Sequence, residues 1–153
     1  MARGKTLLLL LATLLPLTAP GADRGLSARD AWIREAPPGR SVLAAYVEFA
    51  NGGDAPITLV SAASPAAERV EFHAHRHEDG MMRMRRVDQV EVPAQGTLAF
   101  APGGLHLMLF GTAAPRAGAR LEVTFETADG DTLSVTFPVR NAMSDAGKPG
   151  VMR

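Results

Sequence analysis

The sequence contains no cysteine among its 153 residues. This absence excludes disulfide bonds and thiol redox chemistry, and it also removes the thiolate that a blue-copper electron-transfer site requires. Aromatic residues make up only 5% of the chain, with one tryptophan and one tyrosine. Basic and acidic residues are equal in number, so the sequence offers no excess of positive charge for nucleic acid or an anionic membrane.

The first residues have the layout of a secretory signal peptide. Arg3 and Lys5 precede an apolar run over residues 7–17, and small residues follow at positions 19, 21 and 22. The run is too short to span a membrane, so we expect residues 1–22 to be cleaved and the protein to be exported to the periplasm. Without a cysteine after the run, we expect no lipid anchor and no membrane embedding. The remaining chain has 14 basic and 16 acidic residues, and packing alone has to stabilise it.

Proline and glycine separate ten short segments that are rich in β-branched and aromatic residues. Regularly spaced segments of this kind predict an all-β sandwich or barrel. We expect one domain over residues 23–140, followed by a polar, disordered tail over residues 141–153. The predicted strands are residues 27–34, 42–49, 57–62, 70–77, 81–87, 90–92, 97–101, 105–110, 121–127 and 132–139.

Histidine and methionine cluster in one part of the chain. All four histidines lie between residues 70 and 110, as do four of the six methionines that follow the initiator. Imidazole and thioether groups together suit a soft or borderline metal, and copper is the first hypothesis. The clustered residues are His73, His75, His77, His106, Met81, Met82, Met84 and Met108.

Asp79-Gly80 predicts a tight hairpin, because both central positions of a type I′ turn need a positive φ angle. That turn would pair His77 with Met82 and His75 with Met84. Since side chains alternate along a strand, one face of the hairpin would carry three imidazoles and two thioethers. On another strand, His106 and Met108 would also share a face.

Other interpretations of these residues remain open. Methionine often fills a hydrophobic core, and histidine near a turn is often solvated, so a metal-free interaction domain is one alternative. The recurrence of histidine at alternating positions, in register with methionine, favours a metal site. No serine lies near a histidine in a nucleophile motif, so we expect no enzyme activity.

The spacing of four of these residues resembles that of the periplasmic CuA copper chaperones called PCu(A)C proteins. Ten residues separate His73 from Met84, and twenty-one separate Met84 from a His-x-Met motif at His106 and Met108. Similar segments run through residues 30–139, among them Asp30-Ala31-Trp32, Ala36-Pro37-Pro38-Gly39, Glu78-Asp79-Gly80 and Pro102-Gly103-Gly104. The resemblance implies a cupredoxin-like Greek-key sandwich whose four ligands, His73, Met84, His106 and Met108, hold Cu(I).

The resemblance further implies delivery of copper to the copper-bearing subunit of cytochrome c oxidase, with a thiol-bearing copper-assembly protein as a second partner. No nucleic-acid partner is expected. A copper-sequestering or resistance protein without a dedicated recipient would use the same ligands and remains the alternative.

This sequence differs from the PCu(A)C pattern at His75 and His77, where members of that family often have methionine. Imidazole accepts Cu(II) better than a thioether does, so we expect Cu(II) to bind as well. The auxiliary candidates are His75, His77 and Met82. We expect a second, weaker Cu(II) or Zn(II) capability centred on His75 and His77, which fades below about pH 6 as imidazoles protonate.

Overall fold

The computed structural model describes residues 25–141, and these form ten β-strands. None of these residues belongs to a helix that could cross a membrane. The expected signal peptide and nearly all of the expected tail lie outside the described residues. The strands are β1 (Leu26–Arg34), β2 (Leu43–Asn51), β3 (Ile57–Ala63), β4 (Arg69–Glu78), β5 (Met81–Val87), β6 (Val90–Val92), β7 (Gly96–Phe100), β8 (Leu105–Phe110), β9 (Arg120–Thr127) and β10 (Thr132–Arg140).

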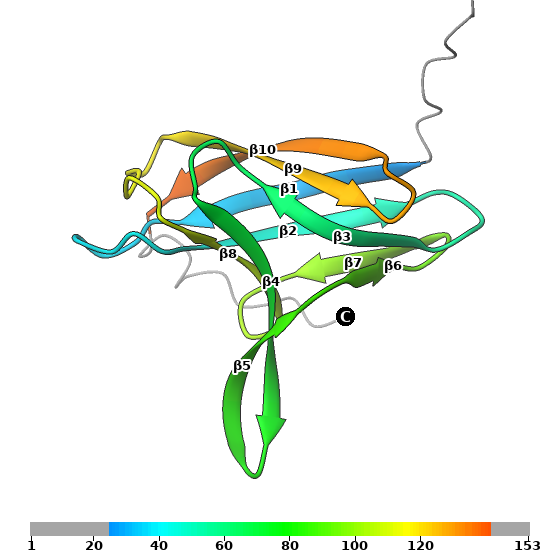
Figure 1. Ribbon diagram of the computed structural model, residues 1–153, viewed down its shortest axis with the longest axis horizontal. Helices are drawn as coiled ribbons and strands as arrows, with labels where there is room; N and C mark the ends of the chain where they lie inside the picture. The colour runs from blue at the N-terminus through cyan, green and yellow to red at the C-terminus, as the bar shows by residue number, and fades with distance from the viewer. Residues whose placement is uncertain (1–24, 142–153) are drawn as a thin grey trace, which may run out of the picture.

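The strands form one mixed sheet in the order β5-β4-β8-β7-β2-β1-β10-β9-β3-β6. β1 runs parallel to β10, and this pairing continues the sheet from one half to the other. The half that contains β3 and β9 lies over the half that contains β1 and β2 (Figure 1). Phe49 of β2 meets Phe125 of β9 across the core, with ring centroids 4.9 Å apart. The predicted all-β sandwich is therefore confirmed.

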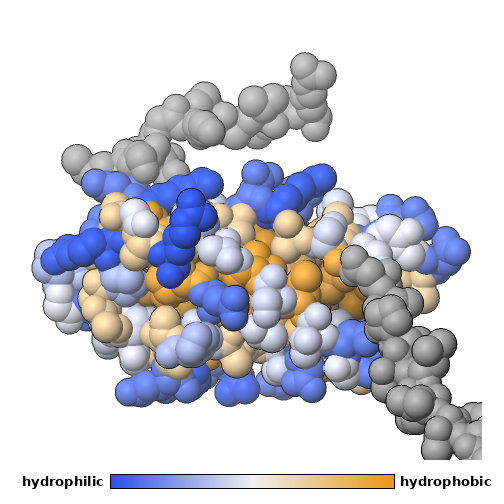
Figure 2. Space-filling view, turned by 90° about the horizontal axis from the view of Figure 1, so that it is seen from above, coloured by the Kyte–Doolittle hydropathy of each residue, from blue (hydrophilic) through white to orange (hydrophobic). Residues whose placement is uncertain are grey.

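Alternation of side chains creates the core between the two halves. Along β9, Leu121, Val123 and Phe125 are buried while Glu122 and Glu126 are exposed. On the face seen from above, hydrophobic residues run along the middle and hydrophilic ones gather along the rim (Figure 2). A strand of this kind has one face that is committed to packing, and this fixes which residues remain for chemistry on the other face.

β8 shows this division most clearly. Leu107 and Leu109 are fully buried in the core, while His106 and Met108 project from the opposite face of the same strand. β8 pairs with β4 in an antiparallel ladder that sets Leu107 opposite Phe72 and His106 opposite His73. The core residues therefore hold the two histidines in register with each other.

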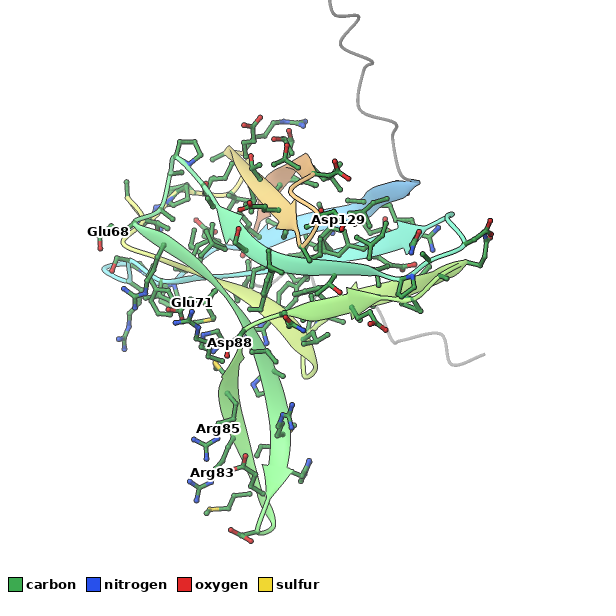
Figure 3. All side chains as sticks on the ribbon, turned by 45° about the vertical axis from the view of Figure 1, so that its right-hand side comes forward. Glu68, Glu71, Arg83, Arg85, Asp88 and Asp129 are labelled. Atoms are coloured by element: carbon green, nitrogen blue, oxygen red, sulfur yellow. The ribbon has the colours of Figure 1, made fainter. Side chains whose placement is uncertain are left out.

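The β4–β5 hairpin forms as the sequence predicts. Asp79 and Gly80 have φ angles of 52° and 76°, the positive values that a type I′ turn requires. The ladder pairs His75 with Met84 and His77 with Met82. β5 is an edge strand, and the hairpin projects below the body of the sandwich (Figure 1), with Arg83 and Arg85 along β5 (Figure 3).

A β-bulge in β1 was not predicted. Between Arg29 and Trp32 the register with β2 shifts by one residue, and Asp30 adopts a φ angle of 54°. The extra residue brings Trp32 opposite Tyr46, and their rings lie 4.5 Å apart. Bulges of this kind re-aim the side chains that follow them.

We expect Leu107→Ala to lower the free energy of unfolding by about 2–5 kcal/mol, because it opens a cavity at a fully buried position. Chemical denaturation followed by circular dichroism measures this change. Val60→Ala is the control, since Val60 is exposed on β3 and should cost less than about 1 kcal/mol. Equal losses in the two variants would contradict the placement of Leu107 in the core.

Candidate metal site

One outer face of three neighbouring strands carries all four residues of the predicted ligand set. His73 on β4 lies opposite His106 on β8, and Met108 lies two residues along β8 on the same face. Met84 on β5 is the cross-strand partner of His75, which makes it a diagonal neighbour of His73. Diagonal neighbours in a sheet are about 7–8 Å apart, within reach of a long side chain. The topology therefore brings the predicted residues together.

The four side chains differ greatly in exposure. His106 is 3% exposed, whereas Met84 is 47% exposed. Met84 therefore lies at the surface, whereas the side chain of His106 is buried. The site thus has a buried side on β8 and an open side on the edge strand β5.

The turn before β8 fixes the His106 ring. Gly103 has a φ angle of 83°, and the turn directs the carbonyl of Gly104 at Nδ1 of His106, 3.0 Å away. Because a carbonyl only accepts, Nδ1 carries the proton and Nε2 keeps its lone pair. Burial lowers the pKa of His106, against the opposing effect of the Gly104 hydrogen bond, and the nearby His75 and His73 lower it further. The ring is therefore neutral near pH 7, the form that binds a metal.

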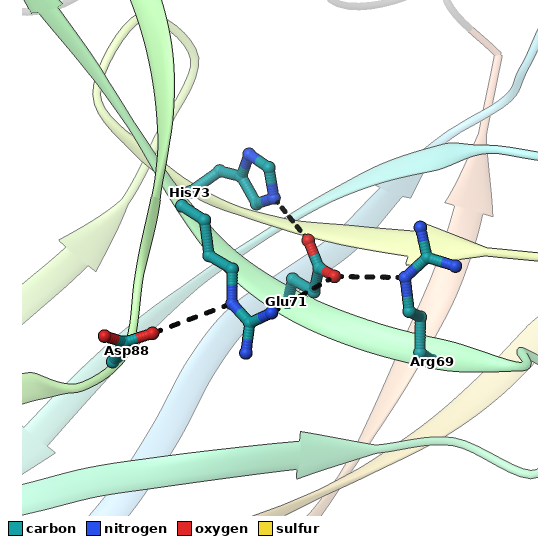
Figure 4. A network of polar contacts seen from close by, with 5 residues as sticks. Arg69, Glu71, His73 and Asp88 are labelled. Carbon is teal, nitrogen blue, oxygen red and sulfur yellow. Dashed lines mark hydrogen bonds and ion pairs between the residues drawn. The ribbon is translucent and has the colours of Figure 1, made fainter.

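The His73 ring is fixed by a carboxylate. Its Nε2 donates to Oε2 of Glu71 at 2.8 Å, so Nδ1 keeps the lone pair, and this atom is buried without a hydrogen-bond partner among the described residues. That hydrogen bond is the main cause that lowers the pKa of Glu71. Arg69 binds the other carboxylate oxygen at 3.0 Å, and Arg86 lies 3.7 Å from it (Figure 4). An imidazole held by a carboxylate on one nitrogen is typical of a metal ligand.

His75 lies closer to the centre of this face than an auxiliary role suggests. Its ring stacks on His106, with centroids 4.9 Å apart and an interplanar angle of 26°. His77 and Met82 are exposed farther along the hairpin. The structure therefore separates His75 from His77, although the sequence grouped them as one pair.

Nitrogen and oxygen ligands alone do not complete a site. Within residues 25–141, no three histidine, aspartate or glutamate side chains are arranged to hold a metal ion. With the side chains placed as they are, the donors that complete a set on this face are the sulfur atoms of Met84 and Met108. Sulfur donors favour a soft ion over one that prefers oxygen.

Two groups that position the histidines were not identified from the sequence. Glu71 lies two residues before His73, and this spacing puts both side chains on one strand face, which was a usable signal. The carbonyl of Gly104 gave no such signal, because its direction depends on the turn. The same carbonyl also accepts the backbone N–H of His75 at 3.3 Å.

Comparison with known proteins gives consistent results. The family described as LpqE-like matches residues 26–139. A curated relative, "Putative lipoprotein Lxx21020" from Leifsonia xyli subsp. xyli (strain CTCB07), is 35% identical over 132 residues, which cover 83% of this chain and 78% of the relative.

Two of the solved structures that are similar to this chain contain copper. The solution structure of CuI-DR1885 from Deinococcus radiodurans is 36% identical, with a TM-score of 0.59, and the match covers 72% of this chain and 74% of that one. A copper-bound PCuAC domain from PmoF2 has a TM-score of 0.63 and covers 76% of this chain and 93% of its own. At 20% identity, the second likeness shows the fold alone. The expected cupredoxin-like class is confirmed.

The two ring environments predict opposite tautomers, with the proton on Nε2 in His73 and on Nδ1 in His106. We expect Glu71→Ala to release His73 into a mixture of tautomers and to leave His106 unchanged, because its Gly104 acceptor is intact. Ring nitrogen chemical shifts from long-range ¹H–¹⁵N NMR measure both rings. Glu91→Ala, which removes an exposed glutamate of β6, is the control. A parent His73 that carries its proton on Nδ1 would contradict the assignment.

Proposed function

This chain belongs to the LpqE-like family, that of the PCu(A)C copper-binding domains, and from this membership we propose that it is a copper chaperone that binds Cu(I). The proposed ligands are His73, Met84, His106 and Met108. Their convergence on one face of β5, β4 and β8 is the observation that carries the proposal.

The donor chemistry supports Cu(I) in particular. Two neutral imidazoles and two thioethers bring no negative charge, which suits a soft, monovalent ion. Both histidines have a nitrogen free for the metal, since Glu71 and the Gly104 carbonyl occupy the other nitrogen of each ring. The 36% identical DR1885 was solved with Cu(I) bound.

The exposure of the ligands supports a carrier rather than a permanent copper centre. A carrier needs a site from which a recipient can remove the ion. Met84 is half-exposed on β5, which among the described strands pairs with β4 alone, so a competing ligand has access to that side. The proposal assigns no catalytic role, in line with a family of copper-binding domains.

We further propose export to the periplasm and transfer of copper to the copper-bearing subunit of cytochrome c oxidase, with a thiol-bearing assembly protein as a second partner. The lipoprotein-like description of the family supports export. The recipient rests on the resemblance to PCu(A)C chaperones. The alternative is a copper-sequestering protein with no dedicated recipient.

We expect the parent protein to retain one Cu(I) per chain against a moderate chelator in an anaerobic titration. Met84→Ala and Met108→Ala should each weaken Cu(I) binding by at least about tenfold, because each removes a ligand from a set of four. His77→Ala is the matched control, since His77 lies on the same face of β4 but farther along the hairpin.

Loss of Cu(I) by the parent to the chelator would refute the proposed function. Equal weakening in all three variants would mean that the ligand set is wrong. Thermal unfolding of each variant without copper separates ligand loss from loss of the fold.

Deletion of the gene should lower cytochrome c oxidase activity under limiting copper, and added copper should restore it. A sequestering protein predicts another result, namely greater sensitivity to excess copper with normal oxidase activity. Oxidase activity in membranes and growth across a copper series measure the two outcomes, and a strain with Met108→Ala should behave like the deletion.

A further inference from the structure

On the outer face of β5, β4 and β8 that carries the proposed ligands, His75 is the residue whose placement is least explained. Its ring lies nearer to His106 than the ring of His73 does, with centroids 4.9 Å apart rather than 5.9 Å. Its Nδ1 atom is buried and has no hydrogen-bond partner among the described residues. A buried polar atom without a partner is unfavourable, and a bound ion would remove that cost.

The backbone holds His75 in this place. Its N–H donates to the carbonyl of Gly104, which also accepts Nδ1–H of His106. One carbonyl thus fixes the position of both residues across the β4–β8 junction. His75 and His106 therefore belong to one structural unit, although thirty residues separate them in the sequence.

Three imidazole nitrogens then become available on this face: Nδ1 of His73, Nδ1 of His75 and Nε2 of His106. Cu(II) prefers nitrogen and oxygen ligands in a tetragonal arrangement, and it accepts thioethers less well than Cu(I) does. The set of two histidines and two methionines serves Cu(I). A third imidazole adds a nitrogen ligand, which is the kind of ligand that this set lacks for Cu(II).

We propose that His75 is a third imidazole ligand that binds copper when the ion at this site is Cu(II), so that one site accommodates both oxidation states. The inference rests on the proposed copper site. To bind the ion, the His75 ring, which stacks on His106, would turn about its side-chain bonds so that Nδ1 points at the ion. His75 thereby determines the specificity of the site for oxidation state.

His77 does not share these features and provides a matched control. It lies on the same face of β4, about 7 Å farther along the strand, and it is exposed opposite Met82. The earlier expectation of a separate site centred on His75 and His77 therefore becomes an outcome that the experiment distinguishes.

The test compares the parent protein with His75→Met and His77→Met, each titrated with Cu(II) in air and with Cu(I) under anaerobic conditions at the same pH. We expect His75→Met to lower Cu(II) affinity by at least about tenfold, the lower end of what the loss of even an outer partner of a metal ligand costs. The electron paramagnetic resonance spectrum of bound Cu(II) should show one nitrogen fewer. Cu(I) affinity should stay near that of the parent, because His75 is not one of the four proposed Cu(I) ligands. His77→Met should change neither affinity.

Unchanged Cu(II) affinity and an unchanged spectrum in His75→Met would overturn the inference. Equal losses in both variants would also overturn it, in favour of a separate site on the hairpin. Failure of the parent to retain Cu(I), with Cu(II) binding that still depends on His75, would refute the proposed function and the sharing of one site, but it would leave His75 as a Cu(II) ligand. The two failures are therefore distinguishable.

Discussion

The pairing of β4 with β8 connects the stability of this protein to its chemistry. On one side of the pair, Phe72 and Leu107 pack into the core, and on the other side His73 lies opposite His106. If this register shifted by one residue, the leucines of β8 would point toward solvent and the histidines would point into the core. The burial energy of the core therefore keeps the site in register. No residue of the site has to contribute to stability for this to hold.

Glu71 introduces a negative charge beside a site whose ligands are neutral, and its surroundings offset that charge. The carboxylate contacts His73 Nε2, Arg69 and Arg86, so two guanidinium groups balance it (Figure 4). The arginine side chains are 57% and 63% exposed, and ion pairs at such positions contribute only about 0–1 kcal/mol to stability. The effect of the two arginines is to balance the charge of the Glu71 carboxylate. Glu71 therefore orients His73 without making the site attractive to divalent cations in general.

The sequence predicts the local features of this structure well. The ten strands follow from alternation and turn residues, and the hairpin register follows from Asp79-Gly80 alone, because a two-residue turn sets the pairs beside it. Pairings between distant segments do not follow in this way. Neither the β4–β8 junction nor the parallel pairing of β1 with β10 has a local signal, so the stack of His75 on His106 could not be predicted. The bulge at Asp30 is similar, since an aspartate with positive φ depends on its partner strand.

The strands that carry the proposed ligands differ in pairing and exposure. His106 and Met108 are on β8, which has paired strands on both sides and a turn held by the Gly104 carbonyl. His73 is on β4, the next strand outward, and Met84 is on the edge strand, whose residues are largely exposed. Strands with fewer buried contacts have a lower free energy of local opening, so the edge of the sheet opens first. In the proposed copper carrier, this difference would set an order of release. A recipient would displace Met84 from the open side while the imidazole of His106 still held the ion, so copper would not have to be free in solution during transfer.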